Sequence, residues 1–68
     1  MKTFGEIFRE KRKAKGLSVQ QLAKRLGTRP NNIYNWEEDK VLPNIWVLCD
    51  VADILECSLD ELCGRVQV

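Results

Sequence analysis

A recurring helix-start motif limits the folds open to this chain more than any other feature. In this motif a serine or threonine is followed three residues later by glutamate or glutamine, and each side chain bonds to the other residue's backbone N–H group. The motif occurs as Thr3 to Glu6, Ser18 to Gln21 and Ser58 to Glu61. Three such helix starts within 68 residues predict an α-helical domain with short, closely connected helices.

Two further helix starts are marked by other residues. Pro30 suits the first position of a helix, where its missing N–H costs nothing, and it pushes Arg29 into the extended conformation of a cap residue. Asn44, which follows Pro43, is a good N-terminal cap. Glycines end the first, second and fifth predicted helices. The five helices are expected over about residues 4–15, 18–27, 30–37, 45–55 and 58–63. No strand pattern is present.

Apolar residues at helical spacing give the first four helices an inward face. The predicted inward residues are Phe4, Ile7, Phe8 and Ala14; Val19, Leu22, Ala23 and Leu26; Ile33 and Trp36; and Ile45, Leu48, Cys49, Ala52 and Leu55. The fourth helix is apolar over more of its circumference than one core can bury, because Val47, Val51 and Ile54 lie on its other side. This surplus predicts a second contact surface.

We expect that second surface to serve a homodimer or a partner protein. Its predicted residues are Trp46, Val47, Ile54, Val66 and Val68. We favour the homodimer; the alternative is a set of ordinary exposed hydrophobic residues followed by a disordered tail.

Charge is divided unevenly along the chain. Residues 1–35 carry nine Lys or Arg against two Glu, a net charge of +7, whereas residues 36–68 carry two against eight Asp or Glu, a net charge of −6. The sum of +1 therefore hides a basic half. A basic half of this kind favours a surface that meets an anionic polymer, and the alternative is a solvated charged surface without a partner.

The composition argues against several function classes. The chain has no histidine, and Cys49, Cys57 and Cys63 form no C-x-x-C pair, so we expect no metal and no cofactor. We interpret the cysteines as reduced thiols and leave a redox role open. Without a glycine-rich phosphate loop, and with a core too small for a large pocket, the chain is not expected to be an enzyme.

The chain also lacks the marks of a membrane or secreted protein. No apolar run approaches the roughly 20 residues of a membrane-spanning helix, and the N-terminus lacks the apolar stretch of a secretory signal. We therefore expect a cytoplasmic protein with no membrane partner. Residues 1–68 are expected to form a single domain, with a core over residues 4–63 and a short tail over 64–68.

The third predicted helix carries the chemistry that points to a function. If Ile33 and Trp36 face inward, Asn31 and Asn35 lie near the centre of the opposite face, four residues apart. An asparagine amide offers an acceptor and a donor in one plane, which match N7 and N6 of adenine in the DNA major groove. The alternative is a structural role without DNA binding, in which Asn31 and Asn32 only interact with solvent or cap the start of the helix.

The stretch "KGLSVQQLAKRLG", followed by "IYNWE", a proline and "VADILECSLDEL", resembles the phage repressor/Cro (xenobiotic-response-element, XRE) helix-turn-helix family. The resemblance covers residues 4–63, almost the whole chain. It implies an all-α, compact five-helix, lambda-repressor-like helix-turn-helix domain that binds a double-stranded DNA operator, usually as a dimer.

The resemblance also implies roles for individual residues. Asn31 and Asn35 match positions where family members read bases, with Asn32 at the flank. Ser18, Gln20 and Lys40 fall near family phosphate-contacting positions. We also expect Arg29 and Tyr34 to contact the DNA backbone. Arg12 and Glu37 match an ion pair that orients the third helix on the first.

Four positions depart from the family pattern. Val19 replaces a glutamine that commonly contacts phosphate, and Pro30 can offer a base only apolar contact. Asp39 replaces a glycine that normally ends the third helix with positive φ. Glu38 and Asp39 also place negative charge in a loop that is often basic, which should repel phosphate.

Two hypotheses follow. The first is a sequence-specific DNA-binding transcriptional regulator, by preference a repressor, that reads the major groove with residues 30–37. The alternative is a helix-turn-helix protein-interaction module, antitoxin-like or anti-repressor-like, that binds a partner protein through Trp46 and the acidic half.

Overall fold

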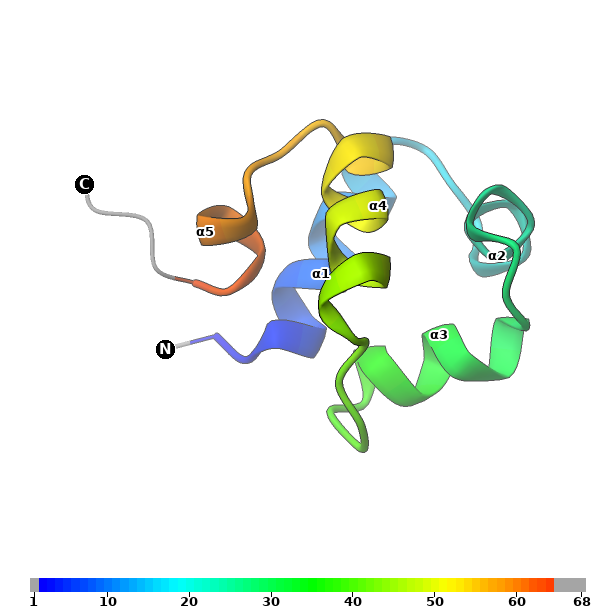
Figure 1. Ribbon diagram of the computed structural model, residues 1–68, viewed down its shortest axis with the longest axis horizontal. Coiled ribbons are helices and arrows are strands. Elements are labelled where there is room, and N and C mark those ends of the chain that lie inside the picture. The colour runs from blue at the N-terminus through cyan, green and yellow to red at the C-terminus, as the bar shows by residue number, and fades with distance from the viewer. Residues whose placement is uncertain (1, 65–68) are drawn as a thin grey trace.

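The computed structural model describes residues 2–64, which fold into five α-helices and contain no strand (Figure 1). The helices are α1 (Phe4–Ala14), α2 (Val19–Leu26), α3 (Pro30–Glu37), α4 (Ile45–Leu55) and α5 (Leu59–Leu62). The predicted all-α fold is confirmed, and each predicted helix end lies within one residue of the observed one.

The predicted helix caps are formed. In all three serine or threonine motifs, the cap side chain accepts the N–H of the residue three positions on, and that residue's side chain accepts the cap's own N–H. Asn44 Oδ1 accepts the Val47 N–H at 2.9 Å at the start of α4. These bonds join residues three positions apart, so local sequence specifies where α1, α2, α4 and α5 begin.

Every helix contributes one side chain with no exposed surface to a common core. These residues are Phe8, Leu22, Ile33, Val51 and Leu62. The Phe8 ring also meets the Trp36 indole edge to face, with centroids 6.1 Å apart and ring planes at 73°. Because each helix is anchored by at least one completely buried residue, the domain depends on all five helices for its stability.

The inward face of α4 differs from the prediction. Val51, expected on the outer side, is completely buried, whereas Ile45, expected inward, is 57% exposed. The observed inward stripe includes Leu48, Val51, Ala52 and Leu55, which share one face at helical spacing. Ile45 lies in the first turn of α4, outside the packed part of that stripe. In α1, Ala14 was also wrongly expected inward and is exposed in the last turn.

The arrangement of the helices leaves α3 at one edge of the molecule. Figure 1 shows α3 next to α2 and near the beginning of α4, while α5 lies at the end opposite α2. Helix α3 packs on α1 and α2, and its other side is not covered by any described helix. Among residues 2–64, no helix combines the length and apolar character needed to cross a bilayer.

Candidate nucleic-acid interface

A short turn between α2 and α3 sets the geometry of the candidate site. Gly27 ends α2 with φ of 71° and ψ of 32°, a left-handed conformation that glycine adopts without strain. Arg29 is extended, with φ of −91° and ψ of 145°, as a residue before proline should be. Pro30 then occupies the first turn of α3, as predicted. The turn therefore fixes the direction in which α3 leaves α2.

Helix α3 has one buried side and one exposed side. Ile33 is completely buried and Trp36 is 7% exposed, so the predicted inward face is confirmed. On the other side Asn31 is exposed and Tyr34 is 49% exposed. Asn35 is half-buried rather than fully exposed, because it lies at the edge of the outer face. A paired amide surface is present, but its two members are not equally accessible.

Asn32 is exposed and its amide already has a partner. Its Nδ2 donates to the Thr28 Oγ1 at 2.7 Å, across the turn that precedes α3. This bond braces the helix start, which is the structural role considered for Asn32 from sequence. Its amide oxygen remains the group that could accept a bond from a ligand.

The predicted ion pair between Arg12 and Glu37 is formed and buried. Arg12 Nε donates to Glu37 Oε2 at 2.7 Å, and Nη2 donates to Oε1 at 3.3 Å. Arg12 is 8% exposed and Glu37 is 6% exposed, so water competes little for this pair. The pair joins α1 to the last residue of α3.

Two partners of this ion pair were not foreseen from sequence. Arg9 Nε also donates to Glu37 Oε1, at 3.3 Å, from a side chain that is 48% exposed. Arg12 Nη1 donates to the Leu17 carbonyl oxygen at 2.8 Å, in the connection between α1 and α2. Arg9 and Arg12 are three positions apart in a helix, so their shared face is the sequence signal that could have revealed the first contact.

The acidic turn after α3 differs from the sequence expectation in one respect. Asp39 has φ of 59°, as predicted from its place in the family pattern. Its carboxylate, however, accepts hydrogen bonds from Thr3 Oγ1 and from the Gly5 N–H at 2.6 and 2.9 Å. These bonds lower the pKa of Asp39, with the Thr3 bond the larger cause. Glu38 pairs with Lys40 at 3.1 Å. Both acidic side chains therefore have partners within the protein.

Ion pairing within the molecule determines where positive charge remains available. Lys11 bonds to Glu61 at 3.0 Å, and Lys15 pairs with Glu56, so the acidic half neutralises part of α1. Across residues 2–64, the basic side chains without an ion pair are Lys13, Lys24, Arg25 and Arg29. Three of these four lie on α2 or in the turn that leads into α3. Unneutralised positive charge is therefore concentrated beside the start of α3.

The residues predicted to contact a DNA backbone are all accessible. Ser18, Gln20, Arg29, Tyr34 and Lys40 are exposed. The Ser18 hydroxyl oxygen accepts the Gln21 N–H at 3.0 Å, so this side chain also caps α2. All five belong to α2, α3 or the turns that flank them.

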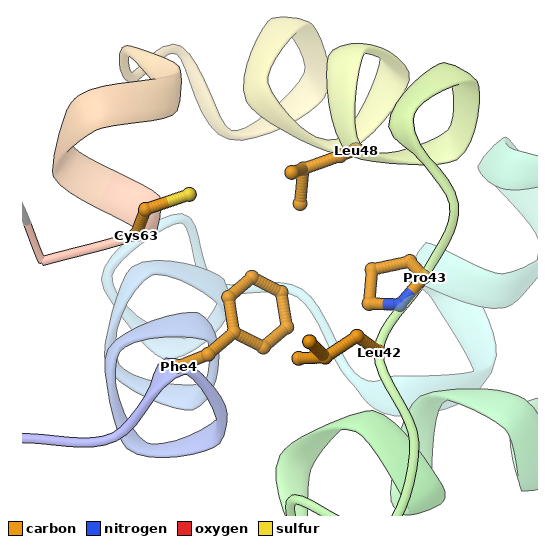
Figure 2. Close-up of a pocket in the computed structure, with 5 residues that line it drawn as sticks. All are labelled: Phe4, Leu42, Pro43, Leu48 and Cys63. Atoms are coloured by element: carbon orange, nitrogen blue, oxygen red, sulfur yellow. The ribbon is translucent and has the colours of Figure 1, made fainter.

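A separate apolar surface lies at the start of α4 and in the loop before it. Its exposed residues are Val41, Leu42, Ile45 and Trp46, of which Trp46 is 78% exposed. An adjoining groove has a volume of about 250 Å³. Figure 2 shows the residues that line it, Phe4, Leu42, Pro43, Leu48 and Cys63. We call Val41, Leu42, Ile45 and Trp46 the α4 apolar patch.

The predicted contact surface overlaps this patch only at Trp46. Val47 and Ile54 are half-buried and pack against the core. Val66 and Val68 lie outside the described residues. The loop residues Val41 and Leu42 were missed from sequence because they belong to no periodic helical face.

The cysteines offer no clustered site among the described residues. Cys49 and Cys57 are half-buried, Cys63 is exposed, and all three are free thiols. Burial raises the pKa of the Cys57 thiol. Within residues 2–64, no group of three metal-ligating side chains comes together.

Comparison with known proteins places this geometry in a family. A helix-turn-helix family model matches residues 8–62. Over 60 residues, the chain is 37% identical to the cryptic phage CTXphi transcriptional repressor RstR of Vibrio cholerae serotype O1. That match covers 88% of this chain and 54% of RstR, so the chain spans about half the length of this relative.

Two solved structures are also similar. The P22 c2 repressor protein, solved in complex with a synthetic operator, has a TM-score of 0.90 and 29% identity; the match covers 97% of this chain and 100% of that one. A transcriptional regulator from Listeria innocua has a TM-score of 0.85 and 29% identity, with 97% of this chain and 62% of that chain covered. The chain thus belongs to the helix-turn-helix family of the phage repressor (XRE) type.

Proposed function

We propose that this protein is a sequence-specific DNA-binding transcriptional regulator that inserts α3 into the major groove. The observation that carries the proposal is the outer face of α3, where Asn31 and Asn35 lie opposite the buried Ile33 and Trp36. The similarity to a phage repressor and to a repressor solved with its operator supports it.

The chemistry of base reading follows from the amide groups. Each asparagine can donate to adenine N7 and accept from adenine N6, because the amide presents its donor and acceptor in one plane. Asn31 is the more accessible reader, and Asn35 reaches the groove from the edge of the face. Asn32 contributes its amide oxygen, since its nitrogen is bonded to Thr28.

Phosphate contacts would position the reading helix. The N-terminus of α2, with Ser18 and Gln20, presents backbone N–H groups and a favourable helix dipole to phosphate. Arg29 lies just before α3, Tyr34 lies on it and Lys40 lies just after it, so these residues would extend the contact along the helix. Lys24 and Arg25, which have no ion pair among the described residues, add positive charge in the last turn of α2.

We infer that the protein acts by occupying an operator, which makes repression by steric occlusion the favoured outcome. A homodimer would double the number of phosphate contacts and steepen the salt dependence of binding. The α4 apolar patch supplies exposed hydrophobic area for such a contact. A DNA target also agrees with the cytoplasmic location expected from sequence.

Selection of bound sequences from a random duplex pool, repeated at two salt concentrations, tests the proposal. We expect an enriched motif with adenine at one or more positions, and affinity that falls as salt rises. Failure to enrich any sequence at either salt concentration would reject sequence-specific binding.

The Asn35→Ala variant assigns the reading role to α3. It should lose about 1–3 kcal/mol at one base position, because one bidentate contact is removed. Asp53→Asn, an exposed change on α4, is the control and should leave base preference unaltered. Equal base preference in Asn35→Ala and the wild type would remove Asn35 from the set of readers.

A second candidate function is binding of a partner protein through the α4 apolar patch. Trp46, at 78% exposed, is the observation that favours it. Trp46→Ala would weaken self-association or partner binding, measured by sedimentation, and leave the base preference of α3 unchanged. Loss of base preference in this variant would contradict a separate contact surface.

A further inference from the structure

Asp39 ends the reading helix through its backbone. With φ of 59°, it directs its N–H to the Trp36 carbonyl at 3.2 Å, and the next N–H, from Lys40, reaches the Asn35 carbonyl at 3.0 Å. These two bonds satisfy carbonyl groups that the end of a helix leaves free. Glycine commonly fills this position, so the backbone conformation alone gives no reason for an aspartate.

The Asp39 side chain has a second role at the other helix. Its Oδ2 accepts the Thr3 hydroxyl at 2.6 Å, and its Oδ1 accepts the Gly5 N–H at 2.9 Å. The Gly5 N–H belongs to the first turn of α1, where backbone donors have no partner within the helix. A carboxylate is also favoured at this end by the helix dipole. One residue therefore ends α3 and caps α1.

Gly5 allows the two helices to approach at this point. A methyl group on Gly5 would lie 2.3 Å from the Glu37 carbonyl oxygen and 2.8 Å from Asp39 Oδ2, both far inside van der Waals contact. The backbone at the end of α3 thus lies directly against the first turn of α1. Any side chain larger than hydrogen would push the two apart.

Helix α3 is consequently held on α1 at two separate places. The Glu37 side chain bonds to Arg12 in the last turn of α1, and Asp39 bonds to the first turn. These two polar attachments add to the packing of Ile33 and Trp36 in the core and hold the C-terminal end of α3 at both ends of α1. Asn35 lies within one helical turn of both.

We propose that Asp39 is a positioning residue for base reading: its bonds to Thr3 and Gly5 set the rotation of α3 and hence the placement of Asn31 and Asn35. This inference rests on the proposed function. It makes the opposite prediction from simple charge repulsion, under which removing the acidic side chain would strengthen DNA binding.

Three variants distinguish positioning of α3 by Asp39 from simple charge repulsion of phosphate. Asp39→Gly keeps the left-handed turn and removes both side-chain bonds. Asp39→Asn also tolerates that turn, and its amide can accept the Gly5 N–H and donate to Thr3. Glu38→Gln removes one negative charge from the same loop and leaves the Asp39 bonds in place.

Each variant would be titrated with the selected operator and with a random duplex of equal length. We expect Asp39→Gly to lose about fivefold or more in the ratio of operator to random affinity, the equivalent of one lost hydrogen bond. Its melting temperature should stay close to that of the wild type, because glycine relieves the left-handed backbone. Asp39→Asn should keep the wild-type ratio, and Glu38→Gln should change both affinities alike.

A wild-type affinity ratio in Asp39→Gly would overturn the proposal, and so would an equal loss in Asp39→Asn and Asp39→Gly. NMR supplies a test that needs no DNA: Asp39→Gly should speed hydrogen exchange at the Gly5 amide and shift the Asn31 and Asn35 resonances. Unchanged Asn31 and Asn35 resonances would also overturn the positioning role.

Failure of the wild type to select any DNA would instead reject the proposed function. The NMR experiment would then still show whether Asp39 sets the position of α3.

Discussion

Arg12 and Glu37 lie 25 positions apart in the chain, yet the Arg12 guanidinium and the Glu37 carboxylate meet through two hydrogen bonds of 2.7 and 3.3 Å in a buried setting. The same guanidinium bonds to the Leu17 carbonyl at 2.8 Å. Arg12 therefore links α1, the α1–α2 connection and the end of α3. The outer face of α3 is the candidate reading surface, so Arg12 helps to hold that surface on the rest of the domain.

Replacing Arg12 should be costly. Arg12→Ala leaves the buried Glu37 carboxylate with only the partly exposed Arg9, and we expect a loss of about 3 kcal/mol in the free energy of unfolding. Arg9→Ala is the matched control and should cost under about 1 kcal/mol, because Arg9 is 48% exposed. Urea denaturation measures both. Similar losses in the two variants would show that burial does not distinguish the two arginines.

Gly5→Ala should destabilise the fold although alanine favours helices. On an unobstructed helix this change would stabilise by about 0.5–1 kcal/mol. Here the new methyl group would meet the Glu37 carbonyl oxygen at 2.3 Å, so we expect a net loss of about 1–3 kcal/mol. Thermal unfolding followed by circular dichroism shows whether Gly5→Ala lowers or raises the melting temperature. A rise in melting temperature would mean that α1 and α3 separate at little cost.

Leu62 should anchor α5 to the core. It has no exposed surface, and Leu62→Ala should cost about 2–5 kcal/mol, which is large for a 68-residue domain. Leu42→Ala is the matched control, since Leu42 is 71% exposed and its truncation should change stability by less than about 0.5 kcal/mol. Chemical denaturation measures the free energy of unfolding of both variants. Equal losses would contradict the assignment of Leu62 to the common core.

Asp39 should make stability sensitive to acid. Hydrogen bonds from Thr3 and Gly5 lower its pKa in the folded state. The stabilising contribution is therefore complete above the unfolded-state pKa of about 3.9, and it is lost as pH falls through the lower folded-state value. Asp39→Asn removes this titration, so its melting temperature should fall less steeply than that of the wild type below about pH 4. If the melting temperatures of the wild type and Asp39→Asn fell equally with pH, the bonds from Thr3 and Gly5 to Asp39 would not stabilise the fold.

Much of the fold could be predicted from sequence because its signals are local. The serine, threonine and Asn44 caps act over three residues, and Pro30 acts on its immediate neighbour, so all five helices could be located. The buried face of α3 was also predictable, because Ile33 and Trp36 are its only large apolar side chains apart from Tyr34. Residues 30–37 therefore predicted a helix with Asn31 on its exposed face, whereas the half-burial of Asn35 was not predicted.

Other features were decided only when the helices packed. Helix α4 is apolar nearly all round, so periodicity could not choose between Ile45 and Val51, and contact with the other helices buried Val51. The bonds from Asp39 to the start of α1 join residues 34 and 36 positions apart, and the pairing of Lys11 with Glu61 spans 50. Such contacts depend on how distant segments meet in space, which no local pattern encodes. The sequence by itself thus determined where the helices begin and which face of α3 is buried, and tertiary packing decided how α3 is held and where positive charge stays free.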